Sequence, residues 1–231
     1  MDHRRPVLAQ RRFAESRTAF DGLDLAQRFD LIHRTNLWGA DSSVSGVGSE
    51  LAATATLRRE LSKLLRDLDI RALLDLPCGD FGWMAHVDLA GVRYLGADIV
   101  PALIAANTAH HARPDRIAFR HLDLVDDPLP AADLILCRDC LVHLSFAHIH
   151  RALRNIRRSG SRWLLTTTFL QITSNGDIDD GDWRPLNLQR APFDFPEPAA
   201  VIVEGCDEAG GDYADKALAL WPIAQLPDVT A

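Results

Sequence analysis

Three aspartates stand where three predicted strands end, and acids at such positions can bind the parts of a nucleoside. Asp75 and Asp98 each close an apolar run, and Asp123 follows a third run. A carboxylate accepts hydrogen bonds and donates none, so Asp98 suits the two hydroxyls of a ribose and Asp123 suits an adenine amino group. The ordered set is a stronger signal than any one acid, and it predicts a site for a nucleoside-containing cofactor.

The tight turn that follows Asp75, within LLDLPCGDFGWM at 73–84, decides between two kinds of cofactor. A nicotinamide dinucleotide requires G-x-G-x-x-G, whereas P-C-G-D-F-G supplies only the last two glycines. Pro77 has no N–H and a φ near about −65°, so it cannot replace the first glycine or donate to a pyrophosphate. S-adenosylmethionine has no phosphate and carries a positive sulfonium, so an acid-rich turn suits it.

The elements that must position these residues alternate between strand and helix after residue 70. This alternation predicts a parallel sheet with right-handed crossovers. The predicted strands are 71–76, 92–98, 116–122, 133–137 and 162–169, and the predicted helices are 83–89, 101–113 and 145–159.

The two ends of the chain differ from this alternating middle. Residues 1–70 are predicted to be helical and end in an amphipathic stretch at 57–68, with a Gly- and Ser-rich loop at 38–50 before it. Two late strands at 200–206 and 217–224 have no full helix between them, so we expect a closing pair with one strand antiparallel.

The order of these motifs resembles the class I S-adenosylmethionine-dependent methyltransferases, over roughly residues 45–225. The turn, together with CRDCLVHL at 137–144, is similar to a bacterial small-molecule subgroup, although Pro77 and Phe81 replace two glycines of the usual D-x-G-x-G-x-G. The resemblance implies an α/β, Rossmann-like doubly wound fold. Its mostly parallel seven-stranded sheet would carry helices on both faces and an N-terminal helical extension.

The same resemblance implies which residues bind S-adenosyl-L-methionine. The methionine and ribose side would be lined by the first strand end and turn, and the adenine side by the third strand end. The expected cofactor-binding residues of the strand ends are Asp75, Pro77, Cys78, Gly79, Asp80, Asp98, Ile99, Asp123, Leu124 and Arg138. The loop at 38–50 either covers the cofactor or is a flexible N-terminal loop. In the first case Trp38, Ser45, Gly46 and Ser49 supply donors to a carboxylate.

The loop after the fourth strand would face the sulfonium in that family, so it holds the candidate catalytic residues. Asp139 is expected to hold the methionine amino group or the substrate, and His143 is the best candidate for a general base. Alignment supplies most of the rate of an in-line methyl displacement, and a base adds ~100-fold for a hydroxyl acceptor. The alternative is a structural or solvated His143.

The loop at 181–196 is the candidate substrate-binding segment. Trp183 offers a stacking surface there, and Arg184 suits a carboxylate or phosphate, so a polar organic molecule is the expected substrate. The alternative is that this loop simply packs over the sheet. The acid-rich segment NGDIDDGD at 175–182 lacks the residue positions of a calcium loop, and we expect a solvated turn and no metal.

Composition limits the classes of partner. The 231 residues carry 25 basic and 32 acidic side chains, and the net charge of −7 argues against nucleic acid and anionic membranes. Four scattered cysteines and an N-terminus without an apolar core predict a cytoplasmic protein with reduced thiols. We expect an extension with a cofactor-covering loop at 1–50 and a methyltransferase domain at 51–231.

The expected function is an S-adenosylmethionine-dependent methyltransferase that modifies a small polar metabolite, with O-methylation favoured. A homodimer is left open. One alternative is an NAD(P)-dependent oxidoreductase, which Pro77 and the absence of a substantial second domain disfavour. The other is a catalytically inactive regulator that binds the same cofactor.

Overall fold

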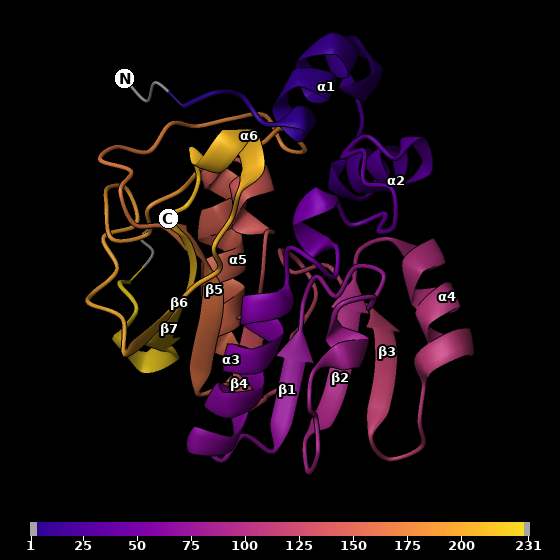
Figure 1. Cartoon of the computed structure of the whole chain (residues 1–231), viewed down its shortest axis with the longest axis vertical. Helices are drawn as coiled ribbons and strands as arrows, with labels where there is room; N and C mark the ends of the chain where they lie inside the picture. Colours follow the sequence, from indigo (N-terminus) through magenta and orange to yellow (C-terminus); the bar gives the residue numbers. More distant parts are fainter. Residues whose placement is uncertain (1–3, 229–231) are drawn as a thin grey trace.

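The computed structural model describes residues 4–228, and the strands within them form a single seven-stranded sheet (Figure 1). Its strand order is β3-β2-β1-β4-β5-β7-β6, and only β7 runs antiparallel to its neighbours. The predicted mostly parallel sheet with an antiparallel closing strand is confirmed. The strands are β1 (Ala72–Asp75), β2 (Arg93–Asp98), β3 (Ile117–His121), β4 (Leu134–Cys137), β5 (Trp163–Phe169), β6 (Ala200–Val203) and β7 (Lys216–Pro222).

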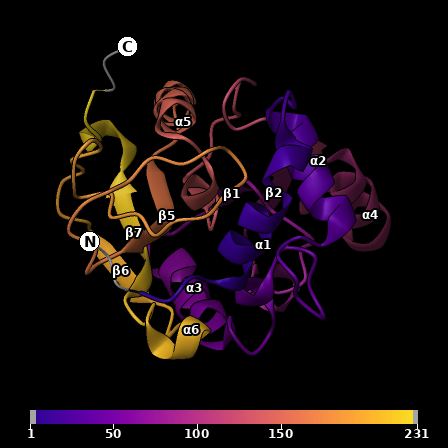
Figure 2. The same cartoon turned by 90° about the horizontal axis from the view of Figure 1, so that it is seen from above.

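Helices cover both faces of this sheet, and two more lie beyond one end of it. Seen from above, α3 and α5 are on opposite sides of the sheet (Figure 2). The helices are α1 (Leu8–Ser16), α2 (Leu25–Thr35), α3 (Ala55–Asp67), α4 (Pro101–His111), α5 (Phe146–Arg158) and the short α6 (Glu208–Gly211). None of them, within the described residues, is both long and apolar enough to cross a bilayer.

The two faces of the sheet are buried by apolar stripes at helical spacing. On α3, Leu57, Leu61 and Leu65 recur every four residues and are buried against the sheet. A corresponding stripe on α5, which includes Ile149 and Leu153, packs on the other face. Because β4 lies between helices on both sides, all four of its residues are buried and its sequence LILC is continuously apolar.

Two local predictions are wrong. Residues 83–89 do not form a helix but a single 3₁₀ turn at Met84–His86, because the buried residues at 83, 84, 87 and 89 do not fall on one helical face. The acid-rich segment 175–182 is not a free solvated turn. Asp180 accepts a hydrogen bond from the backbone N–H of Ser145, and Asp177 accepts one from that of Phe146, both at 2.7 Å. These carboxylates therefore cap the N-terminus of α5.

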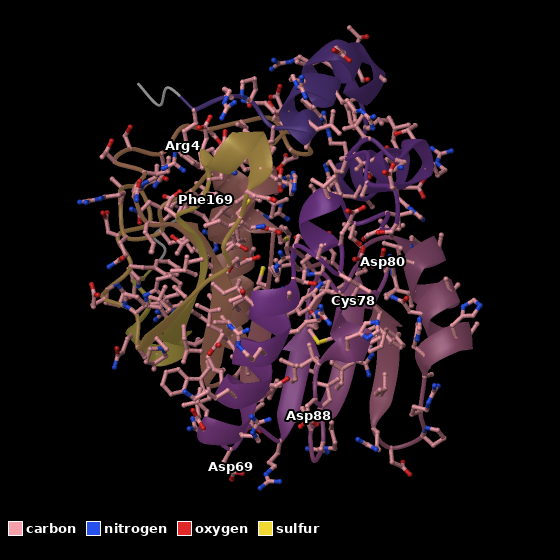
Figure 3. The ribbon with its side chains drawn as sticks, viewed as in Figure 1. Arg4, Asp69, Cys78, Asp80, Asp88 and Phe169 are labelled. Carbon is pink, nitrogen blue, oxygen red and sulfur yellow. The ribbon has the colours of Figure 1, made fainter. Side chains whose placement is uncertain are left out.

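The parallel strands bring their carboxyl ends to one edge of the sheet, and α1 and α2 lie beyond that edge (Figure 1). Phe13, Phe20, Ile32 and Leu37 form a small separate core between these two helices. Figure 3 shows Cys78 and Asp80 at the same end, whereas Asp69 and Asp88 lie at the opposite end. The domain division at residue 50 stays a prediction.

The stripe on α3 generates the first test. Leu61 is fully buried, so Leu61→Ala removes packed methyl groups and leaves a cavity. We expect the free energy of unfolding to fall by about 2–5 kcal/mol in urea denaturation. The exposed neighbour Lys63 provides the control, because Lys63→Ala is expected to change that energy by no more than about 0.5 kcal/mol. Similar losses in the two variants would contradict this packing.

Candidate functional site

The turn after β1 has its backbone donors already engaged. The N–H of Cys78 donates to the carbonyl of Ala97 at 2.8 Å, and the N–H of Gly79 donates to Asp98 Oδ2 at 3.0 Å. The N–H of Asp80 donates to Ser45 Oγ at 3.0 Å. A phosphate placed at this turn would find none of these three groups free, so the turn does not form the anion site of a dinucleotide fold.

Two buried carboxylates flank this turn. Asp98 also accepts from the N–H of Val100 at 3.0 Å, and burial raises its pKa to about 6. Asp75 accepts from the hydroxyl of Tyr94 at 2.6 Å, and burial raises its pKa to about 7. Each side chain is less than 5% exposed because the ends of β1 and β2 lie under the turn. The backbone donors orient Asp98 and leave its remaining lone pairs for a ligand.

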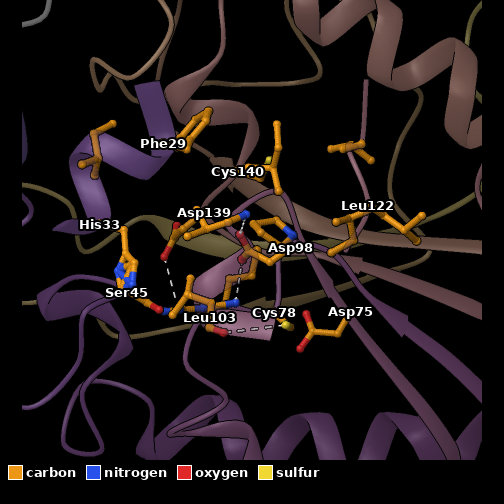
Figure 4. A pocket seen from close by; sticks show the side chains of 18 of the residues that line it. Phe29, His33, Ser45, Asp75, Cys78, Asp98, Leu103, Leu122, Asp139 and Cys140 are labelled. Atoms are coloured by element: carbon orange, nitrogen blue, oxygen red, sulfur yellow. Dashed lines mark hydrogen bonds and ion pairs between the residues drawn. The ribbon is translucent and has the colours of Figure 1, made fainter. Parts of the chain in front are cut away.

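A cavity of about 1000 Å³, open to solvent, lies at these strand ends. Its apolar part is formed by Val100, Leu103 and Leu122, and Figure 4 shows Phe29 and His33 on the side opposite Leu122. We call it the large cavity. The predicted site residues that line it are Trp38, Ser45, Ser49, Asp75, Pro77, Cys78, Gly79, Asp98, Ile99, Asp123, Leu124, Arg138 and Asp139.

Asp80 is not among the residues that line the large cavity, because its carboxylate holds the preceding loop instead. It accepts from Ser43 Oγ at 2.7 Å and from the N–H of Val44 at 3.1 Å. At Gly79, where φ is +55°, an added Cβ would lie 2.2 Å from Ser45 Oγ. The loop therefore packs directly on the turn, and a glycine is needed where the two segments meet.

A second cavity of about 550 Å³ adjoins the first. Trp38, Ser45 and Asp139 line both cavities, which places them at the junction. Of the other predicted site residues, Gly46, His143 and Trp183 line the second cavity alone. The site is thus a pair of adjoining cavities, with Asp139 lining both.

His143 has the geometry of a neutral base. Its Nδ1 lies 2.8 Å from the carbonyl of Asp182, and since a carbonyl only accepts, the proton is on Nδ1 and the lone pair is on Nε2. The ring stacks on Trp38 with centroids 4.5 Å apart. Burial lowers the pKa of His143 to about 4. The imidazole is therefore uncharged at neutral pH, with its single proton on Nδ1.

Asp139 remains charged although it lies at a largely enclosed junction. Burial alone would raise its pKa, but Lys216 Nζ at 2.7 Å and Arg138 at 3.3 Å outweigh that effect and hold the pKa well below its usual range. The N–H of Asp139 donates to Thr167 Oγ1 at 2.8 Å, and φ is +50°. This left-handed backbone turns the carboxylate toward the cavities instead of along β4.

The guanidinium groups of Arg138 and Arg184 bind other groups of the protein itself. Arg138 binds Glu204 at 2.6 Å and the carbonyl of Gly48 at 2.8 Å, so its side chain links two segments although it borders the large cavity. Arg184 lines neither cavity and donates to the carbonyls of Leu141 and Leu144 at 2.9 and 2.7 Å. With its donors spent on the backbone, Arg184 does not fit the role of a substrate ligand expected from its charge.

The structure also shows charged residues that the sequence analysis did not select. Glu208 and Lys216 line the second cavity, and Glu204 lies against Lys216 at 3.7 Å. Lys216 is one of only two lysines in the chain, and that rarity is the one sequence signal that singles it out. Within residues 4–228, no group of three or more His, Cys, Asp or Glu side chains is arranged to hold a metal ion.

A model of the methyltransferase domain family matches residues 74–160, from β1 through α5. The match, together with the strand order, shows that the chain has the fold of the class I S-adenosylmethionine-dependent methyltransferases. S-adenosyl-L-methionine is the cofactor of that family.

Several solved structures resemble the methyltransferase fold of this chain. The PH0226 protein from Pyrococcus horikoshii has a TM-score of 0.52 and 16% identity, covering 74% of this chain and 89% of its own. TnmH has a TM-score of 0.50 and 20% identity, and the match covers 73% of this chain and 56% of TnmH. Human N-acetylserotonin methyltransferase, solved with S-adenosylmethionine, has a TM-score of 0.48 and 15% identity, covering 79% and 59%.

These likenesses have limits that matter for function. This chain spans 66% of the methyltransferase domain of bacterial CtHen1-C and 59% of the human enzyme, less than two thirds of either. No curated protein matches the chain. Because 612 solved chains share the fold, the methyltransferase fold alone does not select an acceptor.

The anchoring of the loop by Asp80 gives the second test. Asp80→Ala removes the acceptor for Ser43 and Val44, so the loop should open more often and the amide of Val44 should lose protection. Hydrogen exchange is expected to rise about tenfold at Val44 and little in the buried strand β4. The exposed Asp21 provides the control variant, Asp21→Ala. Unchanged exchange at Val44 would contradict this anchoring.

Proposed function

We propose that this protein transfers the methyl group of S-adenosylmethionine to a small polar molecule, and that an acceptor hydroxyl is its preferred target. The observation that carries the proposal is the pair of adjoining cavities at the carboxyl ends of the methyltransferase-family strands. One is lined by Asp98 and the turn after β1, and the other is lined by a neutral histidine, His143.

The large cavity suits this cofactor in shape and chemistry. Its apolar part, which includes Val100 and Leu103, can accept an adenine, and Asp98 can accept from the ribose hydroxyls. The ring nitrogens His33 Nδ1 and Trp38 Nε1 are buried without a hydrogen-bond partner among the described residues. The carboxylate of the cofactor's methionine part would supply the acceptor that the Trp38 N–H lacks. The engaged amides of the turn disfavour the pyrophosphate of a nicotinamide cofactor.

The chain's own residues can then assist the transfer. When bound, S-adenosylmethionine supplies an electrophilic methyl group on a sulfonium, which a nucleophile takes in line with release of a neutral thioether. Asp139 presents an ionised carboxylate at the junction, where it can accept a hydrogen bond from the methionine amino group or the substrate. His143 Nε2 accepts the proton that an acceptor hydroxyl gives up, while the Asp182 carbonyl fixes the tautomer and the orientation of the ring.

Two further features support a small-molecule substrate in a reducing compartment. The net charge of −7 does not suit a polyanionic partner. All four cysteines are free thiols, which supports the proposed cytoplasmic location. A regulator without activity would bind the same cofactor but show no turnover, so cofactor binding and methylation are tested separately.

The first of these tests measures binding of S-adenosylhomocysteine by calorimetry. We expect the wild-type protein to bind it and Asp98→Ala to weaken binding by about tenfold or more, because the ribose hydroxyls lose a charged acceptor. Asp67→Ala, at the exposed end of α3, removes the same charge elsewhere and should bind normally. Circular dichroism checks that Asp98→Ala is folded. Absent binding, or binding untouched by Asp98→Ala, would contradict the proposal.

Methylation is tested by the pH dependence of turnover, with an acceptor identified by a mass-spectrometric metabolite screen. A base must be unprotonated to act, and the pKa of His143 lies near 4. We therefore expect kcat to stay level between about pH 6 and 8 and to fall only below about pH 5. A midpoint near 6.5, the ordinary value for histidine, would contradict a buried His143 base.

His143→Gln separates the catalytic role from a structural one. If His143 is the base, this change lowers kcat by about 100-fold or more and leaves S-adenosylhomocysteine affinity unchanged, because His143 does not line the large cavity. Equal loss of turnover and of cofactor affinity would identify a structural role instead.

A further inference from the structure

The second cavity has a charged wall in which one carboxylate is left over. Asp139, Lys216 and Glu208 line it, and Arg138 and Glu204 contact this group without lining the cavity, which makes two cations and three acids in all. Arg138 pairs with Glu204 at 2.6 Å, and Lys216 pairs with Asp139 at 2.7 Å. These two close pairs leave Glu208 as the unmatched group. This group of five charges therefore lacks one positive charge. An unmatched charge in a poorly solvated place is costly.

Glu208 is available to a ligand. Its side chain is half-buried, lines the second cavity and makes no hydrogen bond among the described residues. Burial raises its pKa and outweighs the opposing effects of Lys216 and Arg138, neither of which forms an ion pair with it within 4 Å. An incoming positive charge would favour the ionised form.

Gly48 leaves room in front of this group. A Cβ at Gly48 would lie 3.4 Å from Glu208 Oε1, 3.4 Å from Lys216 Nζ and 3.7 Å from Asp139 Oδ2. Three charged atoms from three segments therefore surround one point that carries no side chain. A side chain at position 48 would stand against Glu208, so the glycine keeps the space beside this carboxylate open.

The rest of the second cavity is aromatic. Phe169, Trp183 and Tyr213 meet edge to face with ring centroids 5.1–5.9 Å apart, and Trp38 lies on the side of His143. Aromatic rings bury apolar ligand surface, and their faces attract cations. Lys216 does not reverse this preference, because its ammonium already contacts Asp139 and lies 3.7 Å from Glu204.

We propose that the second cavity selects methyl acceptors that carry a positively charged amino group on an aromatic or apolar body, and that Glu208 is the carboxylate that binds the amino group. This rests on the proposed function, because it takes the second cavity as the acceptor site. Glu208 does not line the large cavity, whereas Asp139 lines both. Its removal therefore affects the acceptor and not the cofactor.

Three phenols that differ only in the tail test this assignment: tyramine with an ammonium, para-ethylphenol with no charge, and para-hydroxyphenylpropionate with a carboxylate. Each is titrated by calorimetry at pH 7 into the protein saturated with S-adenosylhomocysteine. We expect tyramine to bind about tenfold or more tighter than para-ethylphenol, and the carboxylate to bind weakest. In Glu208→Gln the preference for tyramine should shrink to about twofold or less.

Asp207→Asn is the matched control, because it removes one negative charge at the exposed neighbouring position and should keep the preference. The proposal is overturned if tyramine binds no tighter than para-ethylphenol, if the carboxylate binds best, or if Glu208→Gln retains the preference. It is also overturned if Glu208→Gln weakens S-adenosylhomocysteine instead of tyramine. Failure of the wild-type protein to bind S-adenosylhomocysteine contradicts the proposed function itself, whereas normal binding without a charge preference contradicts only the role of Glu208.

Discussion

The buried guanidinium of Arg138 is the interaction on which the rest of the site depends. It follows directly after β4, binds Glu204 after β6, and holds the carbonyl of Gly48 in the N-terminal loop. It also stacks over Trp83 at 5.4 Å. Removing one partner from such a buried pair costs about 3–5 kcal/mol, because the other charge stays unpaired. The Arg138 side chain thus links β4 at the centre of the sheet, the end of the edge strand β6, and the N-terminal loop that covers the site.

This central pair determines how charge is distributed over the two cavities. Since Glu204 neutralises Arg138, Lys216 is free to pair with Asp139 and keeps that carboxylate ionised at the junction. Asp75 and Asp98 lack such partners, and burial raises their pKa values instead. Acids that look alike in the sequence therefore differ in pKa because of what lies beside them.

Much of the fold and part of the site were predictable from local patterns. Apolar runs ending in Asp75 and Asp98 indicated parallel strands with a ligand edge, and the parallel pairing of those strands is confirmed. The pattern failed where distant contacts decide conformation. The 83–89 segment buries residues that share no helical face, and Asp177 and Asp180 bind the N-terminus of α5 from some 30 residues further along the chain. Arg184 looked like an anion ligand, yet its donors go to backbone carbonyls.

By itself the sequence determined the class of fold, the edge of the sheet where a ligand can bind, and the exclusion of a glycine-rich phosphate turn through Pro77. These follow from periodicity and from backbone chemistry, which are local properties. Only the tertiary structure decided which charges are neutralised and which remain free. It brought Lys216 to Asp139, took Asp80 out of the cavity to hold the loop, and left Glu208 unmatched. Charge pairing depends on distances between segments far apart in the chain, and no spacing along the sequence records those distances.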